Sequence, residues 1–167
     1  DVNIRGMERF GARKETPLET CIAEVEQSDI YIGIISYRLG SIEKKSGKSF
    51  TQLEYEKALD LNLDIFIYLL DEKNGRISPT FIDFGENYEK LESFKSILRD
   101  RHTIDTFVDE HDLHDKLKRK FDELLLKKKQ SDKEPDEYEK SKSVINRFLL
   151  VPKVYSGMEV ILKVNFK

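Results

Sequence analysis

The feature that most constrains this chain is an uninterrupted apolar run at residues 30–35, Ile-Tyr-Ile-Gly-Ile-Ile. The run is short, rich in β-branched side chains and without a polar face. Such a run is typical of a strand buried on both faces, and strands of this kind occur in parallel sheets that are covered by helices. A second run of the same type, Asp-Ile-Phe-Ile-Tyr-Leu-Leu, follows at residues 64–70.

Amphipathic segments alternate with these two strands. The sequence Thr-Pro-Leu-Glu at residues 16–19 predicts a capped helix start, with Pro17 at the first helical position and Glu19 reaching back to the cap. Strands and helices joined by short connections predict βαβ units with right-handed crossovers, and therefore an α/β fold with a doubly wound, flavodoxin-like parallel sheet. The remaining elements are expected as a weak strand within residues 1–10, helices at about 49–61, 87–101 and 112–126, and a short strand at 103–108.

The α/β pattern covers residues 1–126. A flavodoxin-type sheet has its first strand in the middle, so we expect a further strand and helix upstream of Asp1. Residues 127–143 are almost wholly charged or polar, which predicts a linker. Residues 144–167 return to strand patterning but are too few to bury a core, so we expect the β-rich start of a further domain or a docked hairpin.

Charge and composition exclude several classes of partner. The 29 basic and 32 acidic side chains are well mixed along the chain, so we expect no nucleic-acid partner. No apolar run approaches the roughly 20 residues of a membrane span, and no signal-peptide pattern is present. Cys21 falls within a helical pattern and is expected to be a small buried residue in a reducing, cytoplasmic compartment.

Open parallel sheets bind ligands beyond the carboxyl ends of their strands. Here the first buried strand is followed by the loop at residues 36–48 and by a helix that opens with Ser-Phe-Thr-Gln-Leu-Glu at residues 49–54. A helix start presents free backbone N–H groups that suit phosphate or carboxylate. Positive charge at the same rim, which comes from Arg38, Lys44, Lys45 and Lys48, predicts a small anionic ligand such as a nucleotide.

Other chemistries lack the residues they need. The histidines His102, His111 and His114 have no cysteine or further histidine at ligand spacing, so no metal site is expected. Ser-Gly-Lys-Ser at residues 46–49 resembles the end of a P-loop but lacks the earlier glycine, so we reject an ATPase. We expect no bound cofactor.

Three stretches resemble a known family: residues 28–33 (Ser-Asp-Ile-Tyr-Ile-Gly), 38–41 (Arg-Leu-Gly-Ser) and 49–55 (Ser-Phe-Thr-Gln-Leu-Glu-Tyr). With their surroundings they resemble a domain of unknown function found ahead of STAND-type NTPases, which is grouped with TIR domains and nucleoside 2-deoxyribosyltransferases. The resemblance implies a TIR-like domain that belongs to a larger multidomain protein of signalling or defence and assembles into homo-oligomers.

The resemblance also implies a site. Deoxyribosyltransferases carry Thr-x-x-Glu at this helix start, and TIR enzymes place a glutamate on the equivalent helix, so the catalytic carboxylate would be Glu54, with Thr51 beside it. It would act at the anomeric carbon of an N-glycosidic bond in NAD or a related nucleotide, the substrate, through an oxocarbenium-like state. The ligand-binding residues at the same rim would be Tyr37, Arg38, Gly40, Ser41, Ser49 and Thr51.

The residues themselves leave alternatives open. If Thr51 is the helix N-cap, Thr51 and Glu54 form a capping box that stabilises the helix by about 1 kcal/mol. Arg38 either binds an anion or pairs with a local acid, and Tyr37 either stacks on a base or shields the strand end. The three lysines of the loop are most often a solvated surface.

Two functions follow from these alternatives. In the first, the domain is an N-glycosidic-bond enzyme, and Glu54 should face an enclosed, dry cleft. In the second, the domain is a non-catalytic module that senses a nucleotide or drives oligomerisation, and Glu54 can lie on an open helix cap. A metabolic deoxyribosyltransferase is less favoured, because the pattern predicts that the chain continues into another domain.

Overall fold

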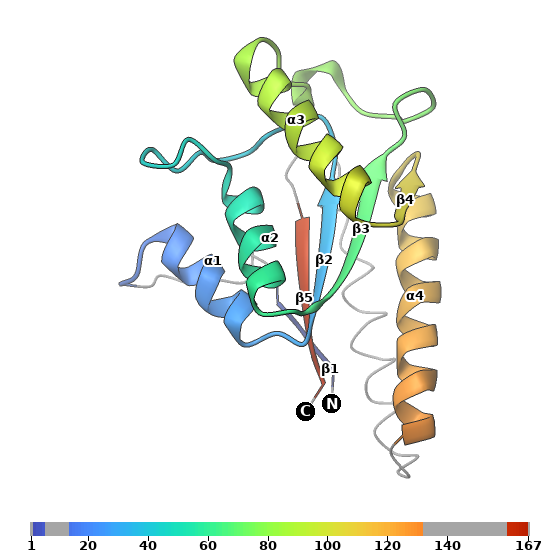
Figure 1. Cartoon of the computed structure of the whole chain (residues 1–167). Coiled ribbons are helices and arrows are strands. Elements are labelled where there is room, and N and C mark those ends of the chain that lie inside the picture. Colours follow the sequence, from blue (N-terminus) through green and yellow to red (C-terminus); the bar gives the residue numbers. More distant parts are fainter. Residues whose placement is uncertain (1, 6–13, 132–159, 167) are drawn as a thin grey trace.

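The computed structural model describes residues 2–5, 14–131 and 160–166 (Figure 1). Its helices and strands alternate over most of the chain. In chain order they are β1 (Val2–Arg5), α1 (Pro17–Glu26), β2 (Ile30–Ile35), α2 (Phe50–Asp60), β3 (Asp64–Leu70), the short 3₁₀ helix η2 (Pro79–Phe81), α3 (Glu86–Arg101), β4 (Ile104–Phe107), α4 (Glu110–Ser131) and β5 (Val160–Phe166).

The strands form one five-stranded sheet in the order β1-β5-β2-β3-β4. β2, β3 and β4 are parallel, with Ile30 opposite Asp64 and Ile67 opposite Ile104. β5 is antiparallel to both of its neighbours, and its Leu162 lies opposite Ile32 of β2. The place that a flavodoxin-type sheet gives to its first strand is therefore taken by β5, from the segment expected to begin a further domain or to dock as a hairpin.

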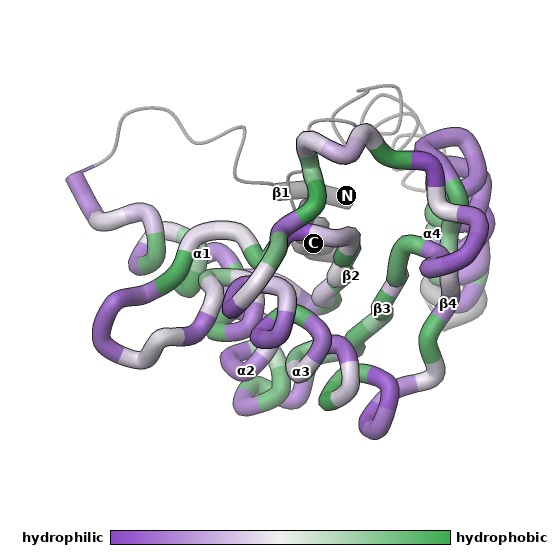
Figure 2. Tube along the Cα trace, turned by 90° about the horizontal axis from the view of Figure 1, so that it is seen from above, coloured by the Kyte–Doolittle hydropathy of each residue, from purple (hydrophilic) through white to green (hydrophobic). Residues whose placement is uncertain are grey.

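Helices cover both faces of the sheet, with α1, α2 and α3 on one side and α4 on the other (Figures 1 and 2). The side chains of β2 alternate between two hydrophobic cores, one on each face of the sheet. Ile30, Ile32 and Ile34 pack in the core that α4 covers, whereas Tyr31 and Ile35 pack in the core of the other three helices. All six residues of β2 are buried, which confirms the predicted doubly wound α/β arrangement.

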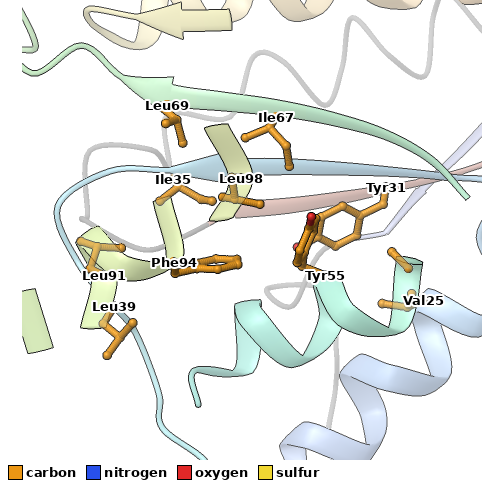
Figure 3. Packing of buried hydrophobic residues seen from close by; sticks show 11 residues of the cluster. Val25, Tyr31, Ile35, Leu39, Tyr55, Ile67, Leu69, Leu91, Phe94 and Leu98 are labelled. Carbon is orange, nitrogen blue, oxygen red and sulfur yellow. The ribbon is translucent and has the colours of Figure 1, made fainter. Parts of the chain in front are cut away.

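An aromatic cluster fills the core beneath α2 and α3 (Figure 3). The ring of Tyr55 lies 5.6 Å from that of Phe94 and 6.4 Å from that of Tyr31, measured between centroids. The ring of Tyr31 extends along β2 over Gly33, where an added Cβ would lie 3.3 Å from Tyr31 Cε1 and 3.0 Å from Ile67 Cδ1. The absence of a side chain at Gly33 leaves the space that this ring occupies.

The start of α1 agrees with its predicted capping box, whereas α4 ends later than predicted. The predicted capping box of α1 is present, since Thr16 N donates to Glu19 Oε2 at 2.8 Å and Glu19 N donates to Thr16 Oγ1 at 3.3 Å. α4 continues to Ser131, so its last turn lies in the stretch predicted as a linker; residues 132–143 of that stretch are outside the described residues.

Two further expectations concern single features. Cys21 is fully buried in α1, as predicted. Within the part of the chain that the structure describes, no helix is long and apolar enough to cross a membrane.

Candidate functional site

The start of α2 differs from the capping box considered for Thr51 and Glu54. Ser49 is the N-cap, with an extended backbone and with Oγ accepting a hydrogen bond from Gln52 N at 3.1 Å. A bridge between Ser49 and Ile42 holds the cap residue at the base of the preceding loop. Since the helix begins earlier than a cap at Thr51 requires, Glu54 falls in the second turn, and the capping-box interpretation is wrong.

Glu54 is a buried residue of α2. Its exposure is 1%, and it shares one face of α2 with Thr51 and Ala58, which are also buried. α1 packs beside α2 and has a buried carboxylate of its own, Glu24, which is 2% exposed. Burying a carboxylate is costly unless polar groups surround it. The position is therefore a dry site inside the domain and not an open helix cap.

The hydroxyl of Tyr31 reaches the same turn of α2. Tyr31 OH donates to the backbone oxygen of Thr51 at 3.4 Å, and its ring crosses Gly33 to do so. The strand thus places a phenol beneath the helix turn that carries Thr51 and Glu54. Sequence patterning missed Tyr31 as a site residue because its spacing is that of a core position.

Tyr37 contacts the residue that follows β3 and a lysine in the middle of α3. Its hydroxyl donates to the backbone oxygen of Asp71 at 3.3 Å, and Lys95 Nζ lies 4.9 Å from its ring centroid. Burial raises the pKa of Tyr37, and the nearby Glu72 and Asp71 raise it further. These contacts are those expected of a side chain that shields the strand end, and stacking of Tyr37 on a base stays a prediction.

Arg38 and the residues after it form the rim of the loop. Arg38 Nε lies 3.9 Å from Asp83 Oδ1, and the side chain stays 44% exposed. Gly40 has a φ of 77°, which favours glycine, and is exposed, as is Ser41. The backbone oxygen of Ser41 accepts from Phe50 N at 2.8 Å, so this stretch leads directly into the start of α2.

Acidic groups offset part of the positive charge expected at this rim, whereas Lys44 and Lys45 are exposed. Lys48 Nζ pairs with Glu56 Oε2 at 2.7 Å. The carboxylate of Glu43 accepts hydrogen bonds from Lys45 N at 2.9 Å and Ser46 N at 2.6 Å, which lower the pKa of Glu43 and keep a negative charge at the loop tip. Arg38, which is 44% exposed, is the predicted rim cation closest in sequence to the end of β2 and directly follows Tyr37.

A groove of about 370 Å³ lies between this loop and α3. Ser49, Gln52 and Phe94 line it, together with the carboxylates of Glu86 and Glu89. Among the predicted site residues, Ser49 borders this groove and Glu54 does not. Lys90 also lines the groove and its Nζ lies 2.6 Å from Glu86 Oε1, so two carboxylates and one ammonium leave a net negative charge that does not match the predicted anionic ligand.

A smaller cavity of about 20 Å³ lies at the carboxyl ends of the parallel strands, on the α4 side. Its polar lining comes from Ser36, Arg76, Asp109 and Glu110. The sequence analysis did not select these residues. The signal was present, because Ser36 directly follows β2 and Asp109 closely follows β4, at the edge where ligands of such sheets bind.

In residues 2–5, 14–131 and 160–166 no group of three or more His, Cys, Asp or Glu side chains could hold a metal ion. His102 contacts Tyr55 instead, with 2.9 Å between His102 Nε2 and Tyr55 OH. Burial lowers the pKa of His102, and the neighbouring Arg101 lowers it further. This histidine therefore belongs to the aromatic cluster of the core.

The fold and the polar start of α2 define the class of protein: a doubly wound α/β domain with a buried carboxylate on the helix after its first central parallel strand. Over residues 1–122 the chain matches the family described as Domain of unknown function (DUF4062), and it belongs to that family. Searches of curated proteins and of solved structures give no match.

Proposed function

We propose that this chain is a TIR-like effector or signalling domain of a larger multidomain protein and that it cleaves the N-glycosidic bond of NAD or a related nucleotide. The observation that carries the proposal is the position of Glu54. It is a carboxylate with 1% exposure on the helix that starts at the carboxyl edge of the sheet, and it does not serve as a helix cap. That combination suits a carboxylate that acts on a bound ligand.

The proposed cleavage requires few protein groups besides the Glu54 carboxylate. As the bond from the anomeric carbon to the base nitrogen breaks, its electron pair leaves with the base and positive charge develops on the sugar ring. A carboxylate in a dry site stabilises that charge more strongly than one in water, or bonds to the anomeric carbon until water replaces it. The partly exposed Arg38 is the rim residue suited to the phosphates of the ligand.

A second candidate is a non-catalytic module that senses a nucleotide or drives oligomerisation. One observation favours it: Glu54 lines neither the groove beside α3 nor the cavity beside α4, two hollows that the described residues form. The two functions differ in one property, which is whether a substrate reaches Glu54.

Base release decides between the two functions. The full chain is incubated with NAD and with a panel of nucleosides, dilute and at concentrations that promote oligomers, and free base is measured by chromatography. Glu54→Gln is expected to reduce release by about 100-fold or more, the usual range for removing a group that stabilises charge in the transition state. Glu56→Gln is the matched control, since Glu56 lies on the same helix, is 37% exposed and pairs with Lys48; it should retain release.

Melting temperatures of both variants separate chemistry from folding. Loss of release in a Glu54→Gln protein that still unfolds cooperatively supports the enzyme. If no substrate yields free base in either state, and Glu54→Gln lowers only the melting temperature, then Glu54 is a structural residue and the domain is a binding or assembly module.

A further inference from the structure

Asp83 belongs to the connection between β3 and α3 and has a defined position there. It directly follows Ile82, the residue that ends η2, and lies two residues before Gly85, the N-cap of α3. Backbone hydrogen bonds hold both of these neighbours, from Ile82 N to the oxygen of Pro79 at 3.3 Å and from Glu89 N to the oxygen of Gly85 at 3.1 Å. The short helix before Asp83 and the long helix after it therefore limit where its side chain can go.

Two hydrogen bonds connect Asp83 to the backbone on either side of Arg38. Asp83 N donates to the backbone oxygen of Tyr37 at 2.9 Å, and Leu39 N donates to Asp83 Oδ2 at 2.8 Å. Leu39 is 1% exposed and packs in the core that α1, α2 and α3 cover. Asp83 thus holds both neighbours of Arg38, on the face of the sheet that carries α2.

The second carboxylate oxygen of Asp83 faces the side chain of Arg38. Asp83 Oδ1 lies 3.9 Å from Arg38 Nε, a separation longer than that of a hydrogen bond. No hydrogen bond joins the Arg38 side chain to another residue of the described ranges, and this side chain is 44% exposed. The guanidinium is attracted toward Asp83, while its N–H groups stay available to a ligand.

Holding the backbone of an arginine lowers the free-energy cost of binding an anion. A mobile arginine loses backbone and side-chain freedom when it binds a phosphate, and a site that is organised beforehand loses less. The planar guanidinium matches the oxygens of a phosphate in bidentate geometry, so its orientation affects the affinity. The contribution of Asp83 should therefore appear with ligands that carry a phosphate and not with the same ligands without it.

We propose that Asp83 is a positioning residue: it holds the backbone on both sides of Arg38, so that the guanidinium is presented to a phosphate of the nucleotide. The inference rests on the proposed function, which gives Arg38 a nucleotide to bind, and it applies whether that nucleotide is cleaved or only sensed. Asp83 acts through Arg38 and not on the ligand itself.

Calorimetric titrations of the full chain with AMP and adenosine, which differ only in the phosphate, test this role. Arg38→Gln should weaken AMP binding about tenfold, the usual value of one hydrogen bond to a charged group. Asp83→Ala should weaken it about threefold or more, within the range of coupling between residues in contact, and the double variant should bind no more weakly than Arg38→Gln alone. Adenosine binding should be unchanged in all three variants.

Two further variants separate positioning from general loss of structure. Asp83→Asn keeps an oxygen that accepts from Leu39 N, so it should restore most of the AMP affinity. Asp112→Ala is the matched control, since Asp112 Oδ2 also accepts from a backbone N–H, that of Val108 at 3.0 Å, and pairs with Lys116 Nζ at 3.1 Å, but on α4. Asp112→Ala and Asp83→Ala should both lower the melting temperature, and only Asp83→Ala should weaken AMP binding.

Several results would overturn the positioning role. These are an AMP affinity that Asp83→Ala leaves unchanged, a loss that adds to that of Arg38→Gln, an equal loss of adenosine binding, or an Asp83→Asn variant as weak as Asp83→Ala. Tighter binding of AMP by Asp83→Ala would also overturn it, because the carboxylate would then be a competitor of the phosphate for Arg38.

Base release from NAD keeps the two proposals apart. If the AMP titrations follow the expected pattern and no substrate yields free base, Asp83 keeps its role and the domain is a module that senses a nucleotide. Base release that depends on Glu54, with a KM for NAD that Asp83→Ala does not change, would uphold the enzyme and reject the positioning role. An unmodified chain that binds neither AMP nor NAD would reject both.

Discussion

Gly33 shows how one residue without a side chain organises the core beneath three helices. Its position leaves room for the ring of Tyr31, whose hydroxyl then reaches the backbone of Thr51 in α2. The same ring lies 6.4 Å from that of Tyr55. The absence of a side chain at Gly33 therefore permits the contact between Tyr31 of β2 and the turn of α2 that carries Glu54.

Substitution of Gly33 tests this arrangement. Gly33→Ala places a methyl group 3.0 Å from Ile67 Cδ1 and 3.3 Å from Tyr31 Cε1, and should lower the free energy of unfolding by about 1–3 kcal/mol, as is usual for overpacked cores. Chemical denaturation measures the change. The double variant with Ile67→Val, which removes Cδ1, should recover part of the loss. A Gly33→Ala protein as stable as the original would show that Tyr31 has room to move.

At the scale of elements, α2 depends on its cap. Ser49→Ala removes the acceptor for Gln52 N and should cost about 1 kcal/mol of unfolding free energy, measured by denaturation. Ser96→Ala serves as the control, because Ser96 is an exposed residue in the interior of α3, where alanine is favourable. Equal stability of the two variants would contradict the role of Ser49 as the cap.

The elements that burial or local chemistry determines could be predicted from the sequence. β2 was predictable because burial on both faces admits only apolar side chains, and α1 because its capping box involves residues three apart. The start of α2 was ambiguous, since Ser49 and Thr51 are both good capping residues and only the bridge from Ile42 to Ser49 decides between them.

The candidate site was predictable only where it lies on one continuous segment. Open parallel sheets bind ligands beyond the carboxyl ends of their strands, and this rule predicted a site in the loop after β2 and at the start of α2. The burial of Glu54 depends on packing between elements, which the pattern along α2 alone does not show. Ser36 and Glu110 line the same cavity only because β2, β3 and β4 are neighbours and α4 covers the opposite face from α2.

For the whole molecule, β5 is the element that joins the two parts of the sheet. Among the described strands, β1 pairs with β5 alone, and β5 pairs with β2 on its other side. The pairing partners are distant in sequence and nothing in the local pattern specifies them. The alternation at residues 160–166 predicts a strand but does not indicate its neighbours.

Interrupting β5 should separate β1 from the remaining strands. Leu162→Pro removes a ladder donor from a strand that is paired on both sides, so amide exchange in Val2–Arg5 should accelerate about tenfold or more. The amides that pair β3 with β4 should exchange as before. Leu162→Ala, which keeps the backbone donor, is the control for the lost side chain. Unchanged protection of β1 after Leu162→Pro would show that β1 is held by contacts other than β5.

The position of β5 also bears on the order of events during synthesis on the ribosome. The residues of β1, Val2–Arg5, emerge before those of their partner strand β5, Val160–Phe166, and most of the described chain is made in between. At roughly 5–20 residues per second, β1 waits on the order of ten seconds without a strand to pair with. For that interval β2 also presents an open edge, so nascent chains on neighbouring ribosomes can compete for the place that β5 later fills.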